Sequence, residues 1–84
     1  KKGRFVIFHD GEIAGVMAFT WAGEDKFIID HTEVETKFEG KGLAKQLVMR
    51  AVEFARESNV KILPLCPYAH KIFEKDESMK DVRF

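Results

Sequence analysis

Short runs of alternating and β-branched apolar residues fill the first 34 residues and predict three β-strands. These strands span Arg4–His9, Glu12–Trp21 and Lys26–Val34. Asp10-Gly11 lies between the first two strands and is typical of a two-residue hairpin turn, and the polar stretch 22–25 predicts a second turn. We therefore expect an antiparallel meander.

Alternation along these strands also predicts which side chains share a face. In the second strand it separates Ala14, Val16 and Ala18 from a group formed by Ile13, Met17, Phe19 and Trp21. In the third strand it places Ile28, Asp30, Thr32 and Val34 opposite a second group formed by Phe27, Ile29, His31 and Glu33. His31 and Glu33 are thus expected on the same face as two large apolar residues.

The apolar spacing then changes to three and four residues, which predicts a helix over Gly42–Ser58. Asn59 is typical of the left-handed residue that ends a helix. Val60–Leu65 predicts a fourth strand and Pro67–Phe73 a short second helix, while residues 76–84 have no clear pattern. This order predicts one mixed α+β domain over residues 1–84, whose main helix crosses to a fourth strand parallel to the third.

Net charge, apolar run length and cysteine count indicate which classes of partner and which compartment to expect. The 14 basic and 14 acidic residues cancel, so net charge does not indicate binding to nucleic acid or to an anionic membrane. No apolar run has the length of a membrane span. The single cysteine cannot form an internal disulfide, which favours a reducing compartment. We expect a cytoplasmic or nuclear monomer.

The segment Gly40-Lys41-Gly42 is the clearest candidate ligand site, because it links a strand to the N-terminus of a helix. Glycine permits a sharp turn, and the free N–H groups at a helix N-terminus attract phosphate. An ordinary turn would have the same sequence. Residue 45 is Lys, so the dinucleotide motif G-x-G-x-x-G is absent, as is the nucleotide motif G-x-x-x-x-G-K-[ST].

Four further residues could contribute chemistry. Cys66 follows the fourth strand and precedes a helix, so it is either a reactive thiol or a small buried residue. His31 and Glu33 could form a base with its orienting partner, or lie on a solvated face. Tyr68 is a proton donor or a boundary aromatic residue. His9 and His70 have no ligand partner at a suitable spacing, so we expect no metal site.

Three blocks resemble very small single-domain proteins of the GNAT superfamily of N-acetyltransferases. They are IDHTEV (Ile29–Val34), FEGKGLAKQLV (Phe38–Val48) and LPLCPYAHKIFEK (Leu63–Lys75), and the resemblance runs from about Phe5 to Val82. Gly42 and Ala44 match the last two fixed positions of the superfamily's acetyl-CoA signature, and Lys41 is the usual basic residue. Glu39 departs from it, because Gln or Arg is usual there.

The resemblance implies that the chain binds acetyl-CoA. The pyrophosphate would rest on backbone N–H groups of a loop formed by Gly40, Lys41, Gly42, Leu43, Ala44 and Lys45. The pantetheine arm would lie between the third and fourth strands, paired with backbone groups of Thr32, Glu33 and Val34.

The resemblance also implies chemistry at the end of the fourth strand. Cys66 would accept the acetyl group transiently or protonate the departing CoA thiolate, with Tyr68 as a second candidate for the proton donor. Glu33 or His31 would help to remove the amine proton. The helices that build the acceptor pocket of larger members are missing between the first two strands, which implies an open site for an amine on a protein, a peptide or a polyamine. Two alternatives stay open: a CoA- or acyl-CoA-binding module without catalysis, and a protein-interaction domain.

Overall fold

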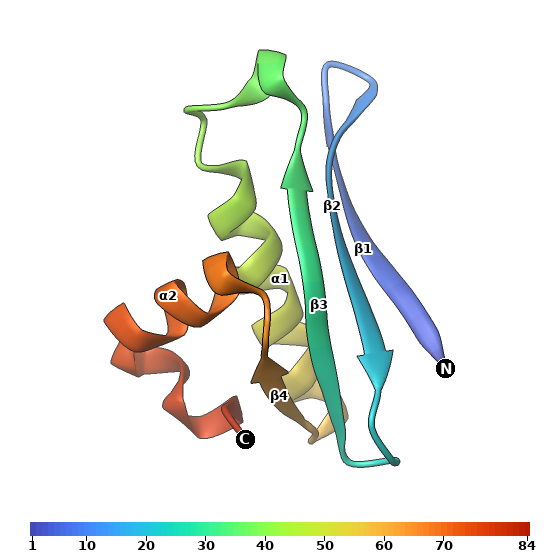
Figure 1. Ribbon diagram of the computed structural model, residues 1–84, viewed down its shortest axis with the longest axis vertical. Coiled ribbons are helices and arrows are strands. Elements are labelled where there is room, and N and C mark those ends of the chain that lie inside the picture. Colours follow the sequence, from blue (N-terminus) through green and yellow to red (C-terminus); the bar gives the residue numbers. More distant parts are fainter.

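The computed structural model describes residues 1–84 as a four-stranded sheet with two α-helices and two 3₁₀ helices (Figure 1). The strands are β1 (Lys2–His9), β2 (Glu12–Trp21), β3 (Lys26–Val34) and β4 (Lys61–Pro64). The helices are α1 (Leu43–Ser58), α2 (Pro67–Lys75), and the short η1 (Thr36–Phe38) and η2 (Glu77–Val82). The sheet order is β1-β2-β3-β4, antiparallel except that β4 runs parallel to β3, which confirms the predicted α+β topology.

Turn and cap residues end the elements where the sequence predicts. Asp10 and Gly11 have φ angles of 53° and 78° and form the tight turn between β1 and β2. Asn59, with a φ of 57°, caps α1 and donates its N–H to the carbonyls of Ala55 and Arg56. Several bounds differ from the prediction: β1 begins at Lys2, β4 is one residue shorter at each end, α1 begins at Leu43 and α2 continues to Lys75. The two 3₁₀ helices have no counterpart in the prediction, and η2 occupies most of the unassigned tail.

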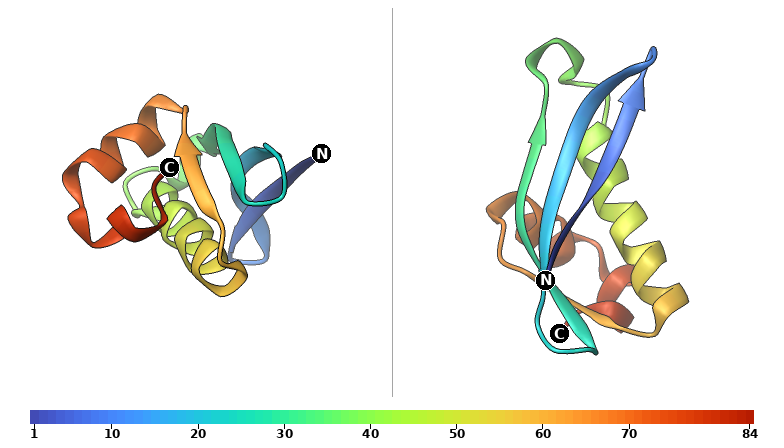
Figure 2. Two further views of the ribbon diagram at one scale, coloured as in Figure 1. Left: turned by 90° about the horizontal axis from the view of Figure 1, so that it is seen from below. Right: turned by 90° about the vertical axis from the view of Figure 1, so that its right-hand side faces the viewer.

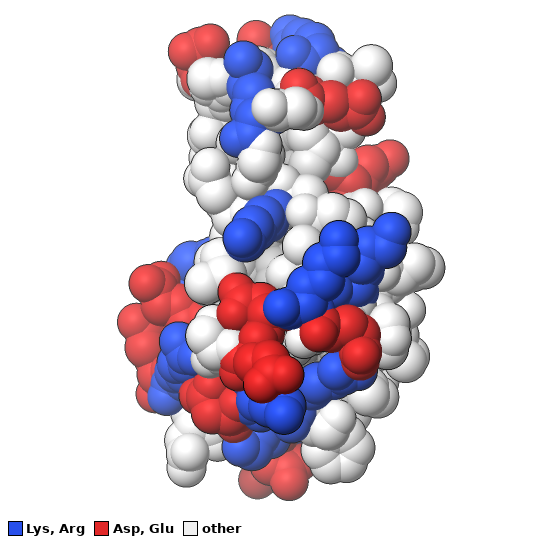
Figure 3. Space-filling model, turned by 90° about the vertical axis from the view of Figure 1, so that its left-hand side faces the viewer, with Lys and Arg blue, Asp and Glu red and all other residues white.

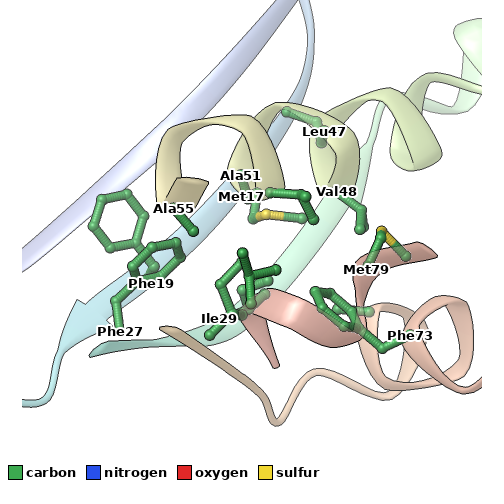
Figure 4. Packing of buried hydrophobic residues seen from close by; sticks show 14 of the residues in the cluster. Met17, Phe19, Phe27, Ile29, Leu47, Val48, Ala51, Ala55, Phe73 and Met79 are labelled. Carbon is green, nitrogen blue, oxygen red and sulfur yellow. The ribbon is translucent and has the colours of Figure 1, made fainter. Parts of the chain in front are cut away.

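One core of 16 residues joins a single face of the sheet to α1, α2 and η2. Figure 4 shows Met17, Phe27 and Ile29 of the sheet packed beneath α1, with Phe73 and Met79 closing the side toward the C-terminus. The helices gather on this side of the sheet (Figure 2). The other face of the sheet therefore has no helix over it.

An extra residue in β2 changes which side chains are buried. Ile7 pairs with Gly15, but the next residue, Phe8, pairs with Ile13, so Ala14 has no partner in β1. This β-bulge interrupts the two-residue period of the strand. Ala14 is consequently fully buried and Ile13 is 49% exposed, so the prediction that Ile13 shares a face with Met17 and Phe19 is wrong.

A second bulge lies in the middle of β3. Phe19 pairs with Ile29, but Ala18 pairs with His31, which leaves Asp30 without a partner in β2. Every side chain after Asp30 therefore points to the face opposite to the one that simple alternation predicts.

This second bulge corrects the predicted faces of β3. Thr32 pairs with Met17, whose side chain is in the core, and so Thr32 lies on the face that the helices cover. His31 and Glu33 lie on the uncovered face. The prediction that they share a face with Phe27 is wrong, because the extra residue reverses the alternation.

Candidate functional site

A pocket of about 340 Å³ lies where the end of β3, η1 and the N-termini of α1 and α2 meet. On this side of the molecule the surface narrows between its upper and lower parts, and both basic and acidic side chains lie above and below the narrowing (Figure 3). Nine residues line the pocket: Thr32, Val34, Phe38, Glu39, Gly40, Gly42, Leu43, Ala44 and Tyr68. The pocket thus brings the glycine loop beside β3 and the first turn of α2.

The glycine loop presents a row of free backbone donors. Gly40 and Gly42 have φ angles of 84° and 73°, a left-handed conformation that other residues adopt only with strain. The first helical bond of α1 runs from the Gln46 N–H to the Gly42 carbonyl, and no N–H from Gly40 to Lys45 donates to another backbone group. Six consecutive N–H groups at a helix N-terminus are therefore free to bind an anion.

The charged side chains around this loop are mixed. Lys41 and Lys45 belong to the loop and to the first turn of α1, and neither forms a salt bridge. Glu39, in contrast, places a carboxylate at the pocket wall. The loop can therefore attract an anion through its backbone and lysines, while Glu39 weakens that attraction.

The hairpin between β1 and β2 holds η1 in place beside the pocket. Lys37 donates to Glu12 over 2.8 Å, and the rings of His9 and Phe38 lie 5.0 Å apart. Phe38 is buried and packs with Ala14 and Leu43 in a second, small core. Sequence reasoning did not identify Phe38 as a pocket residue, although its place two positions before Gly40 is a usable signal.

The end of β3 has a free edge that faces the pocket. The pairing between β3 and β4 ends at Ile29 and Pro64, and the Cys66 N–H then donates to the Ile29 carbonyl over 3.0 Å. Beyond this point, Asp30–Val34 has no partner strand on that side. An extended ligand could therefore hydrogen-bond to the backbone of Thr32–Val34 as an added strand would.

Cys66 lies where β3 and β4 separate, as the residue that precedes α2. Its side chain is only 5% exposed, and its Sγ lies 3.5 Å from Thr32 Oγ1. Cys66 does not itself line the pocket, but Thr32 and Tyr68, which flank it in space and in sequence, both do.

The surroundings of Cys66 favour the thiolate. Burial raises the pKa of the thiol, but hydrogen bonds from the backbone of Ala69, the Thr32 hydroxyl, and the backbones of Tyr68 and Thr32 together outweigh it. The pKa of Cys66 is therefore lowered from its ordinary value, as expected for a thiol at a helix N-terminus. The same residue is thus buried and has a thiol whose pKa is lowered.

Thr32→Val is expected to raise the pKa of the Cys66 thiol, because valine keeps the shape of threonine but cannot donate a hydrogen bond to the thiolate. The rate of alkylation by iodoacetamide should follow the thiolate fraction. The midpoint of the plot of this rate against pH should therefore move to higher pH. Thr20→Val is the control, since the Thr20 hydroxyl bonds to Asp30. An unchanged midpoint in Thr32→Val would show that this hydroxyl does not tune the thiol.

Of the four predicted catalytic residues, Tyr68 is the one that lines the pocket. It is 37% exposed and lies in the first turn of α2, two residues after Cys66. Burial raises the pKa of its phenol, so the hydroxyl stays protonated at neutral pH and can donate a proton or a hydrogen bond.

His31 and Glu33 are close to each other but are not in the pocket. His31 Nε2 lies 3.7 Å from Glu33 Oε1, and both side chains are mostly exposed on the uncovered face of the sheet. The structure thus brings Cys66, Tyr68 and the glycine loop together, and it leaves the candidate base pair on the opposite side of β3.

The structure has neither a cluster of metal ligands nor a membrane-spanning helix. No group of three or more His, Cys, Asp or Glu side chains could hold a metal ion. Neither α-helix has the length and apolar content needed to cross a membrane.

Comparisons with known proteins show the family of the chain. A family model described as GCN5-related N-acetyl-transferase matches residues 4–82. Among curated proteins, Protein NATD1 of Xenopus tropicalis is 31% identical over 61 residues, and human Protein NATD1 is 30% identical over the same length. The match covers 73% of this chain but only 56% and 54% of those two proteins, so the chain spans little more than half of their length.

Three solved structures have the same fold. A GCN5-like protein from Staphylococcus aureus, studied by NMR, has a TM-score of 0.78 at 32% identity, covering 96% of this chain and 80% of its own. Ribosomal-protein-alanine N-acetyltransferase from Brucella melitensis has a TM-score of 0.76 at 24% identity, covering 88% and 60%. A GNAT family acetyltransferase from Elizabethkingia anophelis with acetyl-CoA bound has a TM-score of 0.65 at 19% identity, covering 73% and 40%.

Proposed function

The chain belongs to the GCN5-related N-acetyltransferase family, and from this we propose that it binds acetyl-CoA and transfers the acetyl group to an amine. The observation that supports this most directly is the run of six free N–H groups from Gly40 to Lys45 at the start of α1. These donors and the unpaired Lys41 and Lys45 fit a pyrophosphate, which needs several donors and positive charge. Glu39 reduces the affinity without removing the donors.

The shape of the pocket supports a path for the pantetheine arm and the thioester of acetyl-CoA. The pantetheine arm would extend from the loop along the free edge of β3 and pair with the backbone of Thr32–Val34. Its thioester would then reach the point where β3 and β4 separate, next to Cys66. Phe38 and Leu43 provide the apolar wall against which the arm would pack.

Cys66 would act in one of two ways. As a nucleophile, its thiolate attacks the thioester carbonyl; a new C–S bond forms to Cys66 and the bond to the CoA sulfur breaks, so that CoA leaves as a thiolate. The amine then attacks the acetylated cysteine, and the Cys66 thiolate departs. As an acid, the thiol instead gives its proton to the departing CoA thiolate after the amine attacks directly. Tyr68 is placed for the same proton donation.

The amine must lose a proton before it can attack. Glu33 or His31 would accept this proton on the uncovered face of the sheet, beside the opening between β3 and β4. Their place outside the pocket is also the observation that favours the alternative function, a CoA-binding module without turnover.

Titration of ¹⁵N-labelled protein with acetyl-CoA, followed by NMR, tests the proposal. We expect the amide signals of residues 40–45 to shift with acetyl-CoA at concentrations where inorganic phosphate and ATP have little effect. Absence of shifts in this loop would overturn both the acetyltransferase and the CoA-binding module. Shifts without acetyl transfer to any amine would favour the module.

A further inference from the structure

The uncovered face of the sheet carries a group of apolar side chains among polar ones. The pairing registers place Val6 and Phe8 of β1, Ile13, Val16 and Ala18 of β2, and Ile28 of β3 on this face. Phe8 is 64% exposed and pairs with Ile13, which is 49% exposed. None of the six belongs to either hydrophobic core, and no helix lies on this side (Figure 2). We call these six residues the open face.

An acidic strip borders the open face along β3. Asp30 accepts a hydrogen bond from the Thr20 hydroxyl over 2.6 Å, and Glu33 Oε1 lies 3.7 Å from His31 Nε2. Neither carboxylate has a Lys or Arg within 4.0 Å. Two basic residues of this face, Lys2 and Arg4, lie on β1, about 10 Å away at two strand spacings. The third, Lys26, lies at the start of β3, and its Nζ is 3.5 Å from Asp25 Oδ1. The two carboxylates of the strip therefore have no Lys or Arg partner.

The acidic strip and the proposed site of acetyl transfer lie on opposite sides of the gap between β3 and β4. β3 and β4 separate after Ile29, and Asp30–Val34 forms the rim of the gap. Cys66 lies on the helix side of this rim, within 3.5 Å of Thr32, and Glu33 lies on the open side. A cation attracted to the acidic strip would consequently lie at the gap that leads to the proposed position of the thioester.

We propose that the open face binds the polypeptide that carries the acceptor amine, so that the substrate is a lysine side chain or N-terminal amine of a polypeptide and not a small free amine. This inference rests on the proposed function. The carboxylates attract the ammonium group, and the open face binds apolar side chains of the same polypeptide. Since β1 lies about 10 Å from β3, these apolar residues stand roughly three positions from the amine in an extended chain.

The inference is tested by NMR titration of ¹⁵N-labelled protein saturated with CoA. Three ligands are added in separate titrations. Two are pools of peptides with a central lysine, which has apolar neighbours in the first pool (the apolar pool) and serine neighbours in the second (the serine pool). The third is spermidine, a small free amine. We expect the apolar pool to shift amide signals in 6–8 and 13–18 and to bind about tenfold more tightly than the serine pool. Equal binding of spermidine and the apolar pool, or no shifts in these strands, would overturn the inference.

Variants with matched controls distinguish binding at the open face from the general effect of replacing an exposed apolar residue. Phe8→Gln combined with Ile13→Gln should weaken binding of the apolar pool about tenfold. Met49→Gln is the matched control, because Met49 is an apolar residue exposed on α1 at 39%. Asp30→Asn should weaken binding about threefold, as expected for one partly solvated charge. Unchanged affinity in the double variant, or shifts that depend on protein concentration alone and so indicate self-association, would contradict the proposal.

The same samples distinguish failure of this inference from failure of the proposed function. Acetyl-CoA should still shift the amide signals of residues 40–45 in the double variant, because the glycine loop lies on the helix side of the sheet. Loss of those shifts in the unchanged protein would instead overturn the proposed function itself.

Discussion

Replacing Gly42 by valine is expected to raise the Kd for acetyl-CoA by about 100-fold or more, roughly 2.7 kcal/mol. Gly42 has a φ of 73°, which a β-branched residue adopts only with strain. A Cβ at this position would meet no protein atom within 4 Å, so it would not clash inside the protein. The strain should move the loop away from its left-handed turn and misdirect the N–H groups from Gly40 to Lys45.

Gly23→Val is the matched control for this experiment. Gly23 has a φ of 82° in the turn between β2 and β3, and its Cβ would meet only Asp25 Oδ1 at 3.6 Å. Both variants should lose a similar amount of unfolding free energy, about 1–2 kcal/mol, because the backbone strain is similar. Only Gly42→Val should lose acetyl-CoA affinity, as measured by isothermal titration calorimetry. If Gly42→Val binds as tightly as the unchanged protein, the pyrophosphate does not rest on this loop.

Replacing Cys66 by alanine is expected to abolish acetylation of the protein by acetyl-CoA and to slow acetyl transfer about 1,000-fold, because the attacking thiolate is gone. Acetyl-CoA affinity should change little, since Cys66 does not line the pocket. Cys66 is the only cysteine in the chain, so an acetyl group detected on sulfur by intact-mass analysis can have only one position.

Two measurements on the unchanged protein separate the two roles of the thiol. A nucleophile requires acetylated Cys66 to form before the amine is added, and the transfer rate should rise with pH until the thiolate is fully formed. An acid requires the opposite pH dependence, because only the protonated thiol can donate. Tyr68→Phe is the companion variant, as it removes the second proton donor and keeps the ring at the pocket wall. Normal transfer by Cys66→Ala would exclude both roles for the cysteine.

The sequence predicted the elements well because their signals are local. The spacing of apolar residues in α1, the left-handed Asn59 and the Asp10-Gly11 turn each depend on a few neighbouring residues, and all three have the expected conformation. The glycine loop was recognisable for the same reason, since its φ angles and its position before a helix follow from residue type and order.

The sequence could not predict the faces of Ile13 and Ala14 at the bulge of β2, nor the faces of β3 after its bulge. An extra residue such as Asp30 leaves no local signal, because pairing across strands decides which residue stays unpaired. A shift of one residue then reverses every following side chain. His31 and Glu33 consequently lie on the open side, although alternation groups them with the buried Phe27.

The sequence by itself thus determined the elements, their order and the left-handed turn of the glycine loop before a helix, since these depend on residue type and short-range spacing. Only the tertiary structure decided which groups meet. The bulge at Asp30 brings Thr32 to Cys66, and the separation of β3 from β4 places both beside the glycine loop. Strand pairing is a long-range interaction, so its register is settled when the core packs and not by the residues of one strand.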